Sequence, residues 1–180
     1  HTVTHPPMHR VVSTHFEDMQ AVLQQLAARR YRRPGLVLSE SLSVRVDRAW
    51  LAAYLVMQNE TPPGQRVPAL ILRRAEGEPQ FAAWFADHQP DALLYSDQPV
   101  TQWVAKRKLR VPDDVGLVHL DWSQELAPLA GLDSDPGALG EAAVELLVGQ
   151  LQANEYGEPR HEKIVAVRGH WVEGDSVRPL

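Results

Sequence analysis

Short apolar runs alternate with longer amphipathic segments along nearly the whole of this 180-residue chain. Runs of roughly four to seven apolar residues fit buried strands, and segments of about ten to sixteen residues with apolar side chains at helical spacing fit helices. Parallel strands need a long crossover between them, and a helix provides one. The alternation therefore predicts an α/β fold with a doubly wound parallel sheet and helices on both faces.

The expected elements follow one another with short connections. The strands are expected at residues 11–13, 35–39, 67–72, 92–95, 115–120 and 163–167. The helices are expected at residues 16–31, 44–59, 79–88, 100–108 and 135–153. Ser96 or Asp97 can cap the helix that starts near Pro99, and Asp135 can cap the helix whose first turn contains Pro136.

The composition excludes several kinds of chemistry. The chain has no cysteine, which excludes disulfides, thiolate metal ligands and cysteine nucleophiles. Its formal net charge of −5 provides no broad cationic surface, so this chain is not expected to bind DNA by itself. No run approaches the roughly 18 apolar residues of a membrane span, and no signal-peptide pattern opens the chain. We therefore expect a cytoplasmic protein, and the start at His1 indicates that an upstream portion has been removed.

Three N-terminal histidines could form a metal site. His1, His5 and His9 recur at a spacing that would place them on one face of a helix. Pro6 and Pro7 interrupt such a helix and favour an extended chain. We therefore expect an ordinary terminus and no bound metal.

A basic run ends the expected helix at residues 16–31. It contains Arg29, Arg30, Arg32 and Arg33, which could contact nucleic acid. Cations at this end of a helix also complement its dipole while remaining in water, and no basic or aromatic pattern continues beyond the run. We expect solvated side chains here.

An enzymatic function lacks its usual motifs. The sequence contains no Gly-x-Ser-x-Gly elbow, no phosphate-binding loop and no dinucleotide-binding fingerprint. His119 and Asp121 are two residues apart on an expected strand, so their side chains point to the same face and could share a site. A half-buried histidine that is satisfied by its neighbours is the commoner explanation.

Polar residues gather where the expected strands end, which is where ligands bind in open α/β sheets. Guanidinium groups and carboxylates form paired hydrogen bonds with vicinal hydroxyls, and an aromatic ring can stack on the apolar face of a sugar. This set suits a small polar ligand that is bound without chemistry. Its members are Ser39 to Ser43 with Arg45, Arg73 and Arg74, Ser96 and Asp97, and Asp121 with Trp122.

The order of these motifs, from about residue 11 to residue 178, resembles the effector-binding domain of LacI/GalR-type bacterial transcription regulators, whose fold is the periplasmic-binding-protein-like type I. The most specific segments are Val-Pro-Asp-Asp-Val at residues 111–115, followed by Asp121, and Trp-x-x-Gly-Asp-Ser-Val-Arg at residues 171–178. Residues 90–97 stand where the family has Pro-x-Ala, apolar residues and Asn-Asp. Departures at residues 28–31, 49–50 and 119–120 concern the ligand more than the fold.

The resemblance implies that the chain is mainly the second, C-terminal subdomain of a two-subdomain architecture. In that layout residues 1–16 cross from a missing first subdomain, and 17–127 form the C-terminal effector-binding subdomain. Residues 128–157 form a return helix, and 158–180 form a terminal strand and tail. The apolar face of the helix at 135–153 would then lack part of its packing partner, unless residues 1–16 or another copy cover it.

The resemblance also implies ligand contacts. Asp121 matches the family's effector-contacting aspartate at a strand tip, and Arg45 matches its effector-binding arginine. Ser96 stands where many members have asparagine. The full set of expected ligand-binding residues is Asp121, Arg45, Ser96, Asp97, Arg73, Arg74 and Trp122.

The sequence therefore predicts the effector-sensing domain of a LacI-type regulator. We expect it to bind a sugar or a related small polar metabolite and to modulate DNA binding by a helix-turn-helix that this chain lacks. A homodimer is expected, with no cofactor and no membrane partner. One alternative is a periplasmic-type sugar-binding protein with no DNA-binding role, and another is a small α/β enzyme that uses His119 and Asp121.

Overall fold

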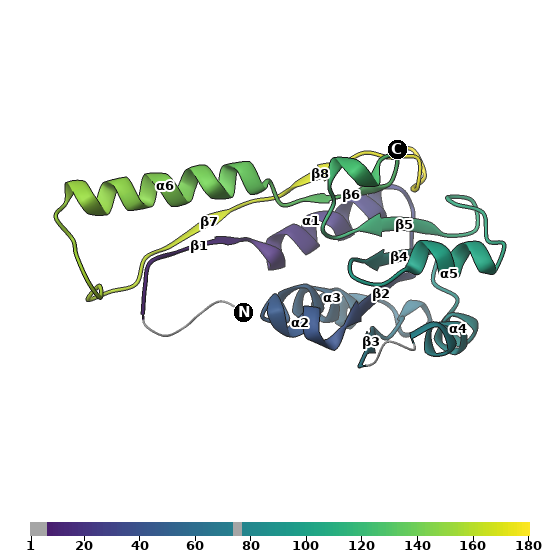
Figure 1. Cartoon of the computed structure of the whole chain (residues 1–180). Coiled ribbons are helices and arrows are strands. Elements are labelled where there is room, and N and C mark those ends of the chain that lie inside the picture. Colours follow the sequence, from purple (N-terminus) through teal and green to yellow (C-terminus); the bar gives the residue numbers. More distant parts are fainter. Residues whose placement is uncertain (1–6, 74–76) are drawn as a thin grey trace.

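The chain contains two separate β-sheets (Figure 1). The computed structural model describes residues 7–73 and 77–180. A six-stranded sheet has the strand order β3-β2-β4-β5-β6-β8, and a separate two-stranded sheet pairs β1 with β7. Every pair is parallel except β6 with β8, which is antiparallel. The predicted α/β fold with a mainly parallel sheet is confirmed.

The six-stranded sheet is short-stranded and buried at its centre. Leu36 of β2 lies opposite Leu94 of β4, which in turn lies opposite Val118 of β5. These apolar strands are buried on both faces, as a parallel sheet between helices requires. The strands are β2 (Pro34–Ser39), β3 (Leu70–Leu72), β4 (Ala92–Tyr95), β5 (Gly116–His119), β6 (Ala130–Asp133) and β8 (His170–Val172).

Alternate residues of the central strands enter two different cores. Leu36 and Leu38 pack with the first core, under α1 (His15–Ala28) and α3 (Ala49–Glu60). Val37 packs with the second core, under α4 (Gly77–His88) and α5 (Val100–Lys106). This alternation follows from the two-residue repeat of a strand, and it confirms that helices cover both faces.

The two-stranded sheet lies to one side of this body. It consists of β1 (Arg10–Ser13) and β7 (Ile164–Val167), with α6 (Pro136–Gln152) alongside (Figure 1). No residue of α6 is buried. Its large apolar side chains Val144, Leu147, Val148 and Leu151 are exposed, so within the described residues this helix lacks a full packing partner, as predicted.

Several predicted boundaries were wrong. The helix expected at 44–59 is two helices, α2 (Glu40–Arg45) and α3, because Asp47 and Arg48 adopt positive φ angles of 51° and 56° between them. The segment expected to hold only a return helix also contains β6, and the C-terminal segment contains β8 in addition to β7. Short 3-10 turns at Pro63–Gln65 and Gln124–Leu126 were not predicted.

The two predicted helix caps had different outcomes. The Asp135 side chain accepts a hydrogen bond from the backbone N–H of Ala138, with Pro136 in the first turn, as predicted. The cap expected from Ser96 or Asp97 was wrong, because α5 begins after Pro99 without a side-chain cap. The carboxylate of Asp97 instead accepts a hydrogen bond from the backbone N–H of Ser39, which joins the ends of β2 and β4.

The prediction that the basic run is solvated was wrong for Arg29. Its side chain is 1% exposed and forms a 2.5 Å ion pair with Glu173. Its guanidinium lies 5.1 Å from the ring centre of Trp171 and also donates to the carbonyl oxygen of Gln25 at the end of α1. Tertiary contacts with the C-terminal segment, which no local pattern indicates, bury this cation.

Candidate functional site

A cavity of about 200 Å³ lies at the carboxyl ends of the central strands. Asp121 reaches it from the segment after β5, and Ser134 from the segment after β6. Arg45 reaches it from the last turn of α2, which follows β2. The cavity therefore forms where a doubly wound sheet is expected to bind ligands. Its other lining residues are His15, Leu42, Val46, Trp50, Leu120 and Leu132.

Trp50, which lines this cavity, carries a buried donor without a partner among the described residues. The residue is 3% exposed, and its indole Nε1 is buried with no hydrogen-bond partner among the described residues. Leaving a buried donor unpaired costs about 1–3 kcal/mol. An acceptor oxygen of a bound molecule would relieve that cost.

His15 packs beside Trp50 at the same cavity. The two ring centres are 5.2 Å apart, and the rings meet edge to face at 68°. Burial lowers the pKa of His15 from its ordinary value, against the opposing attraction of Asp18, Asp121 and Asp47. The lowered pKa favours the neutral imidazole, which carries one donor and one acceptor.

The charged groups complete the polar lining. Asp121 supplies acceptor oxygens and Arg45 supplies a fork of donors, so together they suit a ligand that carries both hydroxyl donors and acceptors. Leu42, Val46 and Leu132 line the same cavity and offer apolar surface. A small polar molecule with an apolar face matches this combination.

A larger hollow of about 620 Å³ adjoins the cavity and shares His15, Arg45 and Val46 with it. Its other walls include β1 and Ile164 and Ala166 of β7, with Thr14, Phe16, Glu17, Asp47 and Ala49. The lining therefore extends from the six-stranded sheet to the two-stranded sheet, and the site lies between these two parts of the chain.

The remaining predicted contacts lie outside the described lining of the cavity. Arg73 follows β3, is mostly exposed and lies 3.6 Å from Glu40. Arg74 falls outside the described residues. Ser96 follows β4, where its carbonyl oxygen contacts the ring of His119. Trp122 donates from its indole Nε1 to the carbonyl oxygen of Leu129 at 2.8 Å.

His119 and Asp121 do not form a catalytic pair in this structure. Nε2 of His119 lies 2.9 Å from the carbonyl oxygen of Ser96 and is therefore the protonated nitrogen. Nδ1 accepts from the backbone N–H of Asp121 at 3.3 Å. Both ring nitrogens are engaged with the backbone, which supports the interpretation of His119 as a satisfied histidine.

Sequence reasoning missed His15, Trp50 and Ser134 as lining residues. The ring of Trp50 packs in the first core, while its N–H is buried without a partner among the described residues. His15 lies two residues after the end of β1, and Ser134 directly follows β6. The position of a polar residue at a strand end was the available signal for both, but β6 itself was not predicted.

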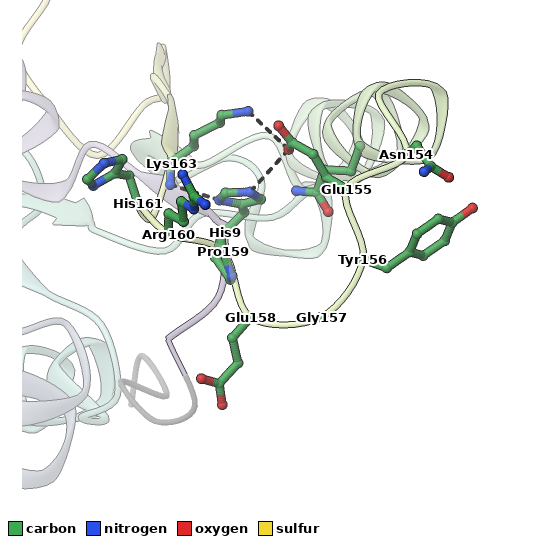
Figure 2. A pocket seen from close by; sticks show the side chains of 11 residues that line it. His9, Asn154, Glu155, Tyr156, Gly157, Glu158, Pro159, Arg160, His161 and Lys163 are labelled. Carbon is green, nitrogen blue, oxygen red and sulfur yellow. Dashed lines mark hydrogen bonds and ion pairs between the residues drawn. The ribbon is translucent and has the colours of Figure 1, made fainter.

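A third hollow, of about 390 Å³, lies beyond the end of α6 (Figure 2). His9 and Lys163 both point toward the carboxylate of Glu155, at 3.9 Å and 3.3 Å (Figure 2). His1 and His5 of the considered metal cluster fall outside the described residues. Within residues 7–73 and 77–180, no group of three potential ligands is placed to hold a metal ion.

The sheet order and the cavity at its strand ends define a ligand-binding α/β lobe. A family model described as a periplasmic binding protein-like domain matches residues 23–177, and the chain belongs to that family. A search of curated proteins by sequence finds no match. No helix in the described part of the chain combines the length and apolar character needed to cross a membrane.

Solved structures share this fold. A LacI family transcriptional regulator from Enterococcus faecalis V583 with bound ribose has a TM-score of 0.72 and 14% identity, over 96% of this chain and 64% of its own. One from Arthrobacter sp. FB24 in complex with lactose has a TM-score of 0.70 and 18% identity, over 92% and 65%.

The lac repressor dimer bound to operator and an anti-inducer has a TM-score of 0.72 and 19% identity, over 94% of this chain and 60% of its own. This chain thus spans less than two thirds of each of these three relatives.

Proposed function

We propose that this chain is the effector-sensing part of a LacI-type transcription regulator and that it binds a sugar or a related polyhydroxylated metabolite without turnover. The meeting of Asp121, Arg45 and Trp50 in one cavity carries the proposal, together with the indole N–H of Trp50, which is buried without a partner among the described residues. The similar structures with ribose and lactose support the ligand class.

In the proposed complete regulator, the ligand acts on DNA indirectly. A helix-turn-helix outside this chain contacts DNA, and a homodimer presents two such headpieces. A ligand that binds one cavity geometry better than another shifts the population of conformers and thereby changes DNA affinity. The similar structure of a repressor dimer on operator DNA supports this arrangement. Such a regulator acts in the cytoplasm.

The proposal includes a second lobe that this chain supplies only in part. Parallel sheets occur almost only with both faces covered, and an isolated two-stranded sheet is marginal in water. The sheet of β1 and β7 and the exposed apolar face of α6 therefore need a further covering layer. Additional chain of the same polypeptide would form that layer over β1, β7 and α6.

Asp121 and Arg45 are proposed as the main charged contacts, with Trp50 and His15 beside them. Ser96, Asp97, Arg73, Arg74 and Trp122 stay predictions, because a ligand would have to extend beyond the described cavity to reach them.

Calorimetric titration of the chain with a panel of pentoses and hexoses tests the proposal. Asp121→Asn and Trp50→Phe each remove one ligand contact, and each should weaken binding about tenfold. Asp87→Asn changes an exposed aspartate on α4 and is the matched control, with binding unchanged. Consumption of the sugar, followed by chromatography, would refute binding without turnover. Absence of saturable heat with every sugar would refute the ligand class.

A further inference from the structure

Three connections join the two-stranded sheet and α6 to the six-stranded sheet (Figure 1). The first is residue 14, between β1 and α1. The second is residues 134–135, between β6 and α6, and the third is residues 168–169, between β7 and β8. Any change in the relative orientation of the two parts must pass through these short segments.

One carboxylate binds two of these connections. Oδ1 of Asp18, in the first turn of α1, accepts a hydrogen bond from the hydroxyl of Thr14 at 2.9 Å. The same oxygen accepts from the backbone N–H of Gly169 at 3.1 Å. The backbone N–H of Thr14 also donates to the carbonyl oxygen of Val167. The first and third connections are therefore held together around Asp18.

The second connection packs against Gly169 of the third connection. A Cβ atom added to Gly169 would lie 2.8 Å from the carbonyl oxygen of Asp133, which is the last residue of β6. The carboxylate of Asp133 also lies 3.8 Å from Nε2 of His170, the first residue of β8. The three connections therefore contact one another at one place in the fold, which we call the junction.

Asp18 is unusual for a residue that only caps or packs. It is 1% exposed, and its Oδ2 is buried with no partner among the described residues. A buried carboxylate with an unsatisfied oxygen is costly. Thr14 stands at the N-cap of α1, but its hydroxyl donates a hydrogen bond to Asp18 and does not cap the helix. The Thr14 side chain thus contributes to the contact between the connections and not to the stability of the first turn of α1.

The junction is continuous with the cavity. His15, next to Thr14, and Ser134, in the second connection, both line it. A rotation at the junction would move Ser134, and the β1 and β7 residues that line the adjoining hollow, relative to Arg45, Trp50 and Asp121 of the six-stranded part.

We infer that Asp18 is a positioning residue that sets the orientation of the two parts of the chain and thereby the width of the larger hollow between them, which adjoins the cavity. The effect on effector binding rests on the proposed function, whereas the effect on orientation does not. Asp18 touches no ligand in this arrangement and acts through Thr14 and Gly169.

Distance measurement by pulsed electron resonance tests the inference on the whole 180-residue chain. Because the chain has no cysteine, Gln102→Cys on α5 and Glu145→Cys on α6 accept one spin label each. Asp18→Ala removes both hydrogen bonds and should shift the ratio of distance populations about tenfold. Asp18→Asn retains an acceptor oxygen at the same position and should reproduce the parent distribution. Gln20→Ala, an exposed change on the same helix, is the control.

Thr14→Val keeps the shape of the side chain but removes one donor, and it should shift the distances in the same direction by a smaller amount. This variant decides the matter if Asp18→Ala does not fold. Distances that are unchanged in Asp18→Ala, or in Thr14→Val where it replaces that variant, would overturn the inference. An equal shift in Asp18→Asn and Asp18→Ala would do so as well.

A separate titration with the sugar panel distinguishes the two proposals. Shifted distances without sugar binding in any variant would sink the proposed function and leave the role of Asp18 intact. Sugar binding with unshifted distances in the Asp18 variant would support the proposed function and overturn the role of Asp18.

Discussion

The two partners of the Arg29–Glu173 ion pair differ greatly in exposure, and this difference predicts an unequal response to their removal. The Arg29 side chain is 1% exposed, and that of Glu173 is 64% exposed. In Glu173→Ala the buried cation loses its counter-charge but stays desolvated. In Arg29→Met the freed carboxylate returns to water at little cost.

The magnitudes follow from that asymmetry. Removing one partner of a fully buried pair costs 3–5 kcal/mol, and exposed pairs contribute about 0–1 kcal/mol. Because one partner is buried and the other exposed, we expect Glu173→Ala to lower the free energy of unfolding by about 2 kcal/mol. Arg29 retains two hydrogen bonds to Gln25 and its contact with the Trp171 ring in that variant, which limits the loss. Replacement of a buried ion by an apolar side chain of similar length is often neutral, so Arg29→Met should cost at most about 1 kcal/mol.

Urea unfolding monitored by tryptophan fluorescence measures both values. Arg32→Met, an exposed arginine of the same run, is the control and should leave the unfolding free energy within about 0.5 kcal/mol of the parent. The double variant should resemble Arg29→Met alone, because no buried cation remains to be stranded. A larger loss of stability in Arg29→Met than in Glu173→Ala would refute the reasoning.

Three further predictions concern the core and the cavity. Burial lowers the pKa of His15 below 6.5, so the unfolded chain binds a proton at a higher pH than the folded chain does. The stability that the neutral imidazole contributes is complete above 6.5 and is lost as the pH falls from there through the folded-state pKa. His15→Gln should therefore flatten the unfolding free energy on that acidic side, and an unchanged slope would contradict the assignment. Tyr54→Phe removes a buried hydroxyl that lies 2.6 Å from the carbonyl oxygen of Val67, and denaturant unfolding should show a loss of about 1–2 kcal/mol. Gly131→Ala places a methyl group 2.7 Å from the Trp122 side chain, and calorimetry should show a melting temperature lower by several degrees, about 2–4 °C for each kcal/mol lost.

The sequence predicted the elements whose signals are local. The alternation of buried strands with helices and the cap at Asp135 depend on neighbouring residues, and both are confirmed. β6 and β8 were missed because each is short, and their antiparallel pairing joins residues 131–133 to residues 170–172. Gly131 weakens the local strand signal, yet it lets the Trp122 ring pack closely.

Only part of the candidate site could be recognised in advance. Asp121 directly follows an expected strand, and Arg45 stands where the family resemblance implies an effector-binding arginine. Trp50 resembled a core residue, since nothing local shows that its N–H lacks an acceptor. The buried state of Arg29 likewise depends on Glu173 and Trp171, far along the chain.

By itself the sequence determined the fold class and the end of the sheet at which ligands are expected, because strand and helix periodicities and helix caps act over a few residues. Only the tertiary structure decided which polar groups share the cavity, that His119 engages the backbone, and that the Trp50 N–H has no partner in the described part of the chain. It also brought Thr14, Asp18 and Gly169 into one junction. The physical reason is that burial and hydrogen-bond satisfaction depend on distant segments meeting in space, which no local pattern encodes.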